Sequence, residues 1–410
     1  MARIIVVYRI FLWLIPVTLG GCFTTSQQDS RRTVILISID GMRADYIERY
    51  NPPTLKALAQ KGAVARGLTP VFPSKTFPSH YSIATGLTAE RHGIVGNRFY
   101  DPQFDQIYTL GNRQAVEDGK WYGGEPIWVT AEKQGVRTAC YFWPGSEARI
   151  KGVRPHRYKK YDGSVPNEKR VDQVVSWLGD PTPSRPRFVT LYFSDVDTAG
   201  HKYGPISPQV AEAVANVDGA IRRLVHGIDR IGMTKAIDLV IVSDHGMAAI
   251  DPQKVIPLAP LLQNFETNKV VVTSTLGMIW SKDHLGAIKR HLKAHQRGFK
   301  VFERHEIPDR LRFKDHRRIA PLVLIMDEGW TLVKEPPSSA KNKPMSKGTH
   351  GYDNQLESMQ GMFIAYGEGV AKSVDVGRIY NIEVYQFIAA LLDIEPAPHE
   401  GRGALLKVLR

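Results

Sequence analysis

The chain has 410 residues, of which 43% are hydrophobic and 23% charged, and its formal net charge is +13. This length and composition predict a globular protein with a sizeable core and exclude a disordered chain. With only two cysteines, Cys22 and Cys140, a disulfide framework is excluded as well. The positive charge is not accompanied by a helix-turn-helix, zinc-finger or RNA-binding signature in the sequence, so we expect no specific nucleic-acid binding.

Residues 1–21 have the pattern of a secretory signal peptide. Arg3 and Arg9 precede an apolar run that is shorter than the about 20 residues of a membrane span. Leu19-Gly20-Gly21-Cys22 resembles the lipobox of bacterial lipoproteins, which implies cleavage before Cys22 and lipidation of Cys22. We therefore expect an exported, periplasmic lipoprotein, and Phe23 after the cysteine favours the outer membrane. An ordinary signal peptide or an uncleaved anchor is the alternative.

Three short apolar runs predict buried strands at Thr33–Ile39, Phe188–Phe193 and Ile237–Val242. Each is nearly continuous and rich in β-branched or aromatic residues, as in a parallel sheet that helices cover on both faces. Helical patterns lie between the strands, at 53–60, 171–178 and 208–228. This alternation predicts a doubly wound α/β/α sandwich.

After residue 254 the pattern changes and predicts a smaller inserted α+β subdomain. Its expected elements are a strand at 269–279, a helix at 287–295, and strands at 300–302 and 322–326. The expected divisions of the chain are a signal peptide at 1–21, a tether at 22–31, a catalytic domain at 32–254 and 346–410, and the inserted subdomain at 255–345. Basic residues concentrate at 282–318, either as a solvated face of the insertion or as a surface that attracts anionic substrates or membranes.

Aspartates follow all three predicted strands. Ligands of open α/β sheets bind outside the carboxyl ends of the strands, so these acids predict a site at that edge. Acids and histidines stand next to glycines in Asp40-Gly41, Asp197-x-x-x-His201, Asp244-His245-Gly246 and His350-Gly351. Three carboxylates and three imidazoles are too many for one tetrahedral zinc ion, but they suit two metals that clamp a phosphoryl group.

A candidate nucleophile lies in the stretch VFPSKTFPSHYSIATGL, at 71–87. Pro73 and Pro78 stiffen the backbone around Thr76, which can stand at the start of a helix, where N–H groups receive phosphate oxygens. A metal can activate a hydroxyl without a separate side-chain base. On this ground alone, Ser74 and Ser79 remain alternatives to Thr76.

Taken together, these motifs resemble the nucleotide pyrophosphatase/phosphodiesterase family of the alkaline phosphatase superfamily. In chain order they are Ser38-Ile39-Asp40-Gly41-Met42-Arg43, Lys75-Thr76-Phe77-Pro78-Ser79-His80, Thr85-Gly86-Leu87, His92-Gly93-Ile94 with Asn97, Gly124-Glu125-Pro126-Ile127-Trp128, Asp197-x-x-Gly200-His201-x-x-Gly204-Pro205, Ser243-Asp244-His245-Gly246-Met247 and Gly348-Thr349-His350-Gly351. The resemblance spans about residues 33–351 and implies an alkaline-phosphatase-like fold in a compact bacterial form.

The resemblance also implies roles for the matching residues. One zinc ion would be held by Asp197, His201 and His350, and a second by Asp40, Asp244 and His245, with Thr76 as a further contact and the nucleophile. Asn97 and the backbone N–H of Phe77 would donate to a phosphate oxygen in the transition state. Phe77 and Tyr192 would enclose a nucleobase or another apolar leaving group, with core packing as the alternative for both.

One stretch departs from the family pattern. Where the family often has Glu-Pro or Glu-Glu-Pro before the metal-binding aspartate, this chain has Ser194-Asp195-Val196. The four-residue step to His201 selects Asp197 as the ligand, which leaves Asp195 as a supporting or turn residue. The departure concerns the choice of substrate rather than the metal site.

The sequence therefore predicts a two-zinc phosphodiesterase or nucleotide pyrophosphatase that acts on nucleotides through a covalent threonine intermediate. Within the superfamily, the alternatives are a phosphomonoesterase, a phosphonate hydrolase and a choline-phospholipid phosphodiesterase. A monoesterase usually binds the phosphate dianion with a cationic group, for which only Arg43 and Lys75 are loose candidates, and Asn97 better suits a diester. A metal-binding lipoprotein without activity is the alternative from another class, which the intact Thr76 and ligand set disfavour.

Overall fold

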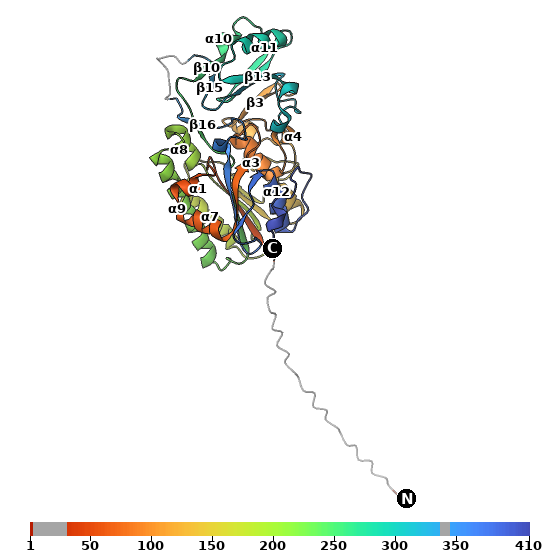
Figure 1. The fold of residues 1–410 in the computed structure, drawn as a ribbon. Helices are drawn as coiled ribbons and strands as arrows, with labels where there is room; N and C mark the ends of the chain where they lie inside the picture. The colour runs from red at the N-terminus through yellow and green to blue at the C-terminus, as the bar shows by residue number, and fades with distance from the viewer. Residues whose placement is uncertain (3–30, 337–344) are drawn as a thin grey trace. The chain divides into compact units, whose positions relative to one another are not determined.

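A nine-stranded sheet forms the centre of residues 32–410 in the computed structural model (Figure 1). Its order is β18-β2-β17-β8-β1-β7-β5-β6, with β19 beside β2. The strands are β1 (Thr33–Ile39), β2 (Ala63–Thr69), β5 (Thr138–Tyr141), β6 (Arg157–Lys159), β7 (Phe188–Phe193), β8 (Ile237–Val242), β17 (Gly361–Tyr366), β18 (Val374–Asp375) and β19 (Arg378–Tyr380). The structure describes residues 1–2, 31–336 and 345–410, so Cys22 and the expected signal peptide and tether lie almost wholly outside the described residues.

The three apolar runs form β1, β7 and β8 with the predicted bounds, and every residue in them is buried. They are neighbours in the order β8-β1-β7 and run parallel. The parallel arrangement expected for these three strands is confirmed, whereas β17, which the sequence analysis did not identify, runs antiparallel to both β2 and β8. The sheet is therefore mixed, as is common for large sheets in this class of fold.

Helices cover both faces of the sheet, which confirms the predicted sandwich (Figure 1). Successive side chains of a strand point to opposite faces, so β1 contributes Ile35 and Ile37 to one core and Val34 and Leu36 to the other. The first core includes side chains of α1 (Tyr46–Tyr50), α2 (Pro53–Lys61), α7 (Asn167–Leu178) and α9 (Pro208–Arg230). The second includes side chains of α3 (Thr76–Thr85), α6 (Ile127–Lys133) and α12 (Glu383–Leu392).

Between residues 255 and 336 the chain builds a second, antiparallel sheet of order β11-β12-β14-β13. Its strands and helices are β11 (Lys269–Val272), β12 (Leu276–Trp280), β13 (Phe299–Glu303), β14 (Leu322–Met326), α10 (Leu258–Leu262) and α11 (Leu285–Ala294). The single strand expected at 269–279 is wrong. The chain turns back at 273–275, where the Thr273 N–H donates to the Leu276 carbonyl, and β11 pairs with β12. The boundaries of the inserted subdomain stay a prediction.

Two single features complete the description of the fold. Cys140 lies in β5, buried and free, and burial raises the pKa of its thiol to about 12, as suits an inert core residue. Among the helices of the described residues, none is long and apolar enough to cross a membrane.

Candidate active site

The carboxyl ends of β1, β7 and β8 deliver three aspartates to one edge of the sheet. Asp40 follows β1 directly, Asp244 comes two residues after β8, and Asp197 stands in the first turn of α8 (Asp195–Tyr203), which begins just after β7. Parallel neighbouring strands end at the same edge, so the three carboxylates meet there. His201 lies one helical turn after Asp197, on the same face of α8.

His350 reaches this edge through a short strand pair. β16 (Gly348–Thr349) pairs antiparallel with β9 (Ala248–Ala249), just after Asp244-His245 in the chain. The ring centroids of His350 and His245 lie 3.5 Å apart as a result. Gly348 lets β16 pack closely against α8, because a Cβ there would stand 2.5 Å from the Gly200 carbonyl oxygen.

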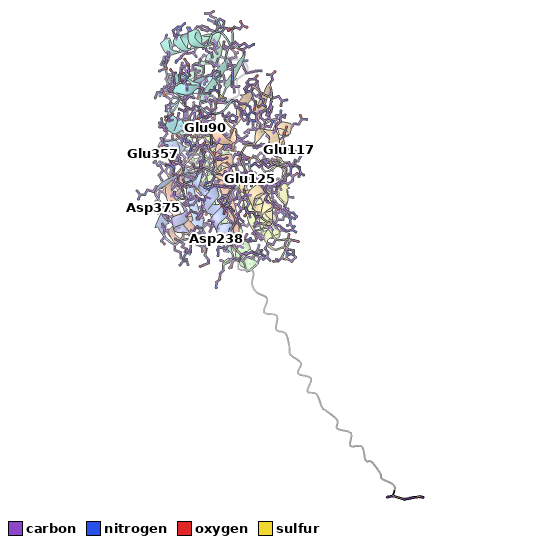
Figure 2. All side chains as sticks on the ribbon, turned by 90° about the vertical axis from the view of Figure 1, so that its right-hand side faces the viewer. Glu90, Glu117, Glu125, Asp238, Glu357 and Asp375 are labelled. Carbon is purple, nitrogen blue, oxygen red and sulfur yellow. The ribbon has the colours of Figure 1, made fainter. Side chains whose placement is uncertain are left out.

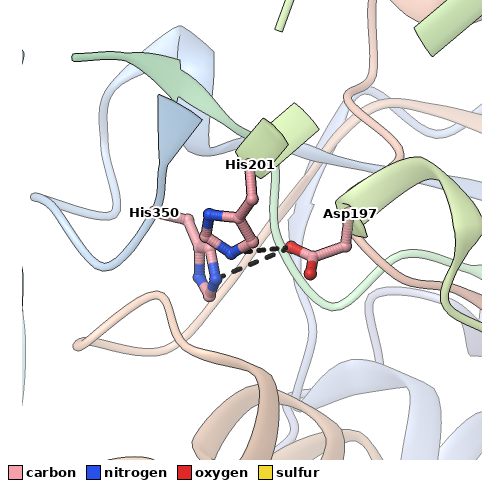
Figure 3. Close-up of side chains that lie close together, drawn as sticks. All are labelled: Asp197, His201 and His350. Carbon is pink, nitrogen blue, oxygen red and sulfur yellow. Dashed lines mark ion pairs between the residues drawn. The ribbon is translucent and has the colours of Figure 1, made fainter. Parts of the chain in front are cut away.

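The six Asp and His residues form two groups that could each hold a metal ion, with the candidate ligand atoms of each group within 4.8 Å of one another. In the first group, Asp197 Oδ1 lies 3.4 Å from His201 Nε2 and 3.6 Å from His350 Nε2 (Figure 3). In the second, His245 Nε2 lies 2.9 Å from Asp244 Oδ2 and 3.5 Å from Asp40 Oδ1. The structure thus brings together the six residues that the sequence grouped.

The two groups differ in exposure. The side chains of Asp40, Asp244 and His245 are buried at the base of the site. In the other group, 18% of the Asp197 side chain and 35% of the His201 side chain are exposed. One candidate centre is therefore enclosed by protein, whereas the other opens to solvent.

The ring nitrogens and carboxylate oxygens of the two groups have free lone pairs that could bind cations. His201 Nδ1, His245 Nδ1 and His350 Nδ1 each lie 2.8 Å from a backbone carbonyl oxygen. A carbonyl only accepts, so each Nδ1 carries the hydrogen and each Nε2 keeps a lone pair for a metal. The buried oxygens Asp40 Oδ1, Asp197 Oδ1 and Asp244 Oδ2 accept no hydrogen bond from protein. These oxygens and ring nitrogens suit zinc, which takes nitrogen and carboxylate ligands.

The electrostatics of the site also favour the binding of cations. Burial, together with the negative charges of Asp244 and Asp197, raises the pKa of Asp40 well above its usual range. Burial also raises the pKa of Asp197. Burial opposes ionisation of Asp244, but positive charge on His245 or His80 would hold the pKa of Asp244 well below its usual range. Bound cations would offset the cost of three carboxylates crowded in a buried site.

Thr76 is the first residue of α3, where the leading N–H groups of a helix have no partner within the helix. Its Oγ1 lies 3.3 Å from His245 Nε2, and the residue lines the cleft in front of both groups. Ser74 and Ser79 are fully buried and do not line this cleft. Ser74 Oγ also donates to the Tyr352 carbonyl at 3.1 Å. The geometry therefore favours Thr76 over the two serines.

The cleft has a volume of about 370 Å³, and Phe77, Asn97 and Tyr192 all line it. Two contacts add to the roles that the sequence suggested. The Phe77 N–H donates to Asn97 Oδ1 at 2.9 Å, so the group left on Asn97 for a substrate oxygen is Nδ2. The Tyr192 hydroxyl donates to Asp40 Oδ2 at 2.6 Å, which ties the aromatic wall to a candidate ligand.

Several cleft and support residues were missed by sequence reasoning. Phe142, Tyr161 and the ion-paired Arg113 and Glu147 also line the cleft. Their separation along the chain gave no signal. His80 could have been found, because it lies one helical turn after Thr76.

His80 and Lys75 stand behind the cleft. His80 is fully buried, with Nδ1 2.8 Å from the Thr76 carbonyl oxygen and 3.2 Å from Asp244 Oδ2. Lys75 Nζ donates to the His350 carbonyl, and burial lowers the pKa of Lys75 to about 8. Arg43 pairs with Asp45. Neither Lys75 nor Arg43 lines the cleft, so neither is placed to bind a phosphate dianion there.

The mixed α/β sandwich and its paired Asp/His groups define an alkaline-phosphatase-like protein with two candidate metal centres. Residues 34–353 match the family described as type I phosphodiesterase / nucleotide pyrophosphatase. The chain belongs to this family, which confirms the resemblance seen in its motifs.

Similar proteins include longer relatives and a solved structure of nearly the same extent. The human ectonucleotide pyrophosphatase/phosphodiesterase family member 1 is 37% identical over 389 residues, covering 92% of this chain and 42% of that protein. A venom phosphodiesterase of Naja atra is 36% identical over 395 residues, covering 92% and 46%. The chain thus spans less than half the length of these two relatives.

The solved structure is that of murine ectonucleotide pyrophosphatase/phosphodiesterase 5. It superposes with a TM-score of 0.85 at 28% identity, over 92% of this chain and 100% of that one. An inactive threonine-to-alanine variant of the murine protein has also been solved in complex with AMP.

Proposed function

We propose that the chain is a metal-dependent hydrolase that cleaves phosphodiester or pyrophosphate bonds of nucleotides. The position of Thr76 carries the proposal: a partly exposed hydroxyl at a helix start, 3.3 Å from a candidate metal-ligand nitrogen and facing the cleft. The AMP complex and the inactive threonine variant of the murine relative support both the substrate class and the nucleophile.

The proposed cofactors are two zinc ions. Asp197, His201 and His350 would hold one, and Asp40, Asp244 and His245 the other, beside Thr76. When bound, zinc supplies Lewis-acid stabilisation of a phosphoryl group and lowers the pKa of a nearby hydroxyl. The Nδ1–H bonds to backbone carbonyls and the unpaired carboxylate oxygens support this ligand set.

The residues of the chain divide the reaction into two displacements. Thr76 Oγ1 forms a bond to phosphorus while the bond from phosphorus to the leaving oxygen breaks, and the threonine proton leaves with the departing group. Water then attacks phosphorus, the bond to Thr76 breaks, and one proton of the water restores the hydroxyl. Asn97 Nδ2 donates to a phosphate oxygen as its charge grows, while the Phe77 N–H holds the amide in place through Asn97 Oδ1.

The aromatic residues of the cleft would bind the nucleobase. Phe77 follows the nucleophile directly, and Tyr192 lines the same cleft with its hydroxyl on Asp40. A flat base between them gains stacking energy, which tolerates any base. The neutral amide of Asn97 suits the single charge of a diester, which supports the diester over the phosphomonoester alternative.

The location of the protein is a separate proposal. We propose that it is exported and anchored to a membrane through a lipid on Cys22. The lipobox resemblance supports this assignment. Cys22→Ala should release the protein from membranes or block its processing. A soluble mature form of the wild type with a free Cys22 thiol would contradict the anchor.

Purified protein assayed on a nitrophenyl nucleotide diester and on nitrophenyl phosphate tests the proposed activity. We expect the diester to be hydrolysed with the higher kcat/KM. A choline phospholipid that is preferred over every nucleotide tested would remove the nucleotide assignment, and preference for the monoester would favour a phosphomonoesterase.

A further inference from the structure

The chain segment that carries Asn97 is held near both of its ends by one buried arginine. Arg318, in the predicted insertion, is only 3% exposed. Its Nη1 donates to the Gly93 carbonyl at 2.7 Å, and its Nε donates to Asp101 Oδ2 at 2.6 Å. Asn97 lies midway between Gly93 and Asp101, just before β3 (Arg98–Asp101). The arginine therefore closes the segment into a loop with Asn97 at its middle.

The packing around Arg318 leaves it little freedom. Its guanidinium lies 5.1 Å from the ring centre of Phe99 and 5.2 Å from that of Trp121, and Nη1 also donates to the Trp121 carbonyl at 2.7 Å. Gly93 has a φ of +79°, and a Cβ there would stand 3.0 Å from Arg318 Nη1. Glycine is thus required at the point where the arginine reaches the backbone.

Neighbouring contacts hold the arginine's own segment in place. Glu90, which is labelled in Figure 2, lies on α4 (Ala89–His92). Its carboxylate accepts from the backbone N–H groups of Lys314 and Asp315 at 2.7 and 3.0 Å. Arg317 adds a second contact to Asp101, at 2.8 Å. Residues 314–318 are therefore fastened to the chain on both sides of Asn97.

We propose that Arg318 is a positioning residue, which sets the place of the Asn97 amide in the cleft through Gly93 and Asp101. The inference rests on the proposed function, in which Asn97 donates to a phosphate oxygen. It extends to the helix of the nucleophile, because Asn97 Oδ1 accepts from the Phe77 N–H. A displacement of about 1 Å in such a group can lower the rate by about a hundredfold.

Arg318→Lys tests the proposal, because lysine keeps the charge but not the guanidinium fork that reaches several acceptors at once. We expect its kcat on a nucleotide diester to fall by roughly tenfold to a hundredfold, with bound metal unchanged. In an Asn97→Ala background the same change should lower kcat by less than about twofold, since coupled residues are not additive. Asp101→Asn, a milder change of the same anchor, should show the same coupling.

Arg310→Lys is the matched control. Arg310 belongs to the same stretch of chain, pairs with Asp353 in a more exposed position, and should keep wild-type kcat as lysine. Losses that multiply fully in the Asn97→Ala background, or a wild-type kcat in Arg318→Lys, would overturn the positioning role.

Amide hydrogen exchange gives a readout that does not depend on activity. Arg318→Lys should speed exchange at the Phe77 N–H, because its acceptor, Asn97 Oδ1, is no longer held in place, whereas Arg310→Lys should not. Unchanged exchange at Phe77 in Arg318→Lys would overturn the inference. A wild-type protein without diesterase activity would instead contradict the proposed function, and the exchange result would still decide on Arg318.

Discussion

The candidate metal ligands and Asn97 reach the same cleft by different structural means. Asp40 and Asp244 follow neighbouring strands, so the central sheet itself sets their spacing. Asn97 stands in a loop whose anchor, Arg318, comes 217 residues after Asp101. The positions of these two metal-ligand candidates therefore depend on regular secondary structure, whereas the position of Asn97 depends on the tertiary contacts of one arginine. Substitutions in the two regions should therefore differ in how much activity they remove and in whether they change the amount of bound metal.

Among the variants near the candidate metal ligands, Thr76→Ala should cause the largest loss of kcat. Without the hydroxyl no covalent intermediate forms, and kcat should fall by roughly a thousandfold or more. The bound metal should stay close to the wild-type amount, because the six Asp and His ligands remain. Steady-state kinetics with metal analysis would check both. Near-wild-type turnover would remove Thr76 as the nucleophile and return attention to Ser74 and Ser79.

His350→Ala should separate the two metal groups. We expect about two zinc ions per wild-type chain and loss of activity on chelation. The variant should bind one of the two ions at least roughly tenfold to hundredfold more weakly, which is the loss of affinity seen when a residue that supports a ligand is removed. The weakened ion should be the one shared with Asp197 and His201. A wild-type stoichiometry of one ion with full activity would contradict the two-metal proposal.

The contrast also explains what could be predicted from the sequence. The strands that deliver Asp40, Asp197 and Asp244 were predictable because a buried apolar run and the polar residue at its end are adjacent in the chain. The antiparallel β17 and the β11–β12 hairpin were not, since strand direction depends on distant pairing partners.

Side-chain contacts between distant segments were likewise beyond the sequence. The Tyr192 hydroxyl on Asp40 joins residues 152 positions apart, and the partners of Arg318 are more distant still. Arg318 could be recognised only as one basic residue in a basic stretch, which favoured a solvated face. Its burial against Phe99 and Trp121 became visible only in the fold.

Tyr192 has two proposed roles: its hydroxyl donates to Asp40, and its ring lines the cleft where a base would bind. Two substitutions separate these roles. Tyr192→Phe removes only the hydroxyl that donates to Asp40, so kcat/KM should fall by roughly tenfold on every diester. Tyr192→Ala also removes the ring and should cost a further tenfold to hundredfold on nucleotide diesters alone. A small diester without a base serves as the comparison. Equal losses in the two variants would show that the ring does not bind a base.

Arg317→Met should have the smallest effect of these variants. It tests the contact between Arg317 and Asp101 through the pH dependence of the free energy of unfolding. Burial alone would raise the pKa of Asp101, but hydrogen bonds from Arg317 and Arg318 outweigh burial and lower this pKa to about 2, from an ordinary 3.8. A lowered carboxyl pKa stabilises the fold above the ordinary value, and this stabilisation is lost as pH falls through the folded-state pKa. Removing Arg317 should therefore cost about 1 kcal/mol near neutral pH.

The stability gap between wild type and Arg317→Met should then close as pH falls from 4 toward 2, where Asp101 becomes protonated in both proteins. This difference in stability is measured by thermal unfolding of both proteins at a series of pH values, with excess zinc in the solution. Metal loss at low pH affects the two proteins alike and cancels in the difference. A gap that stays constant down to pH 2 would mean that Arg317 stabilises the loop by packing on Phe104 rather than through Asp101. Arg318 would then be the sole charged anchor of the Asn97 segment among the contacts described.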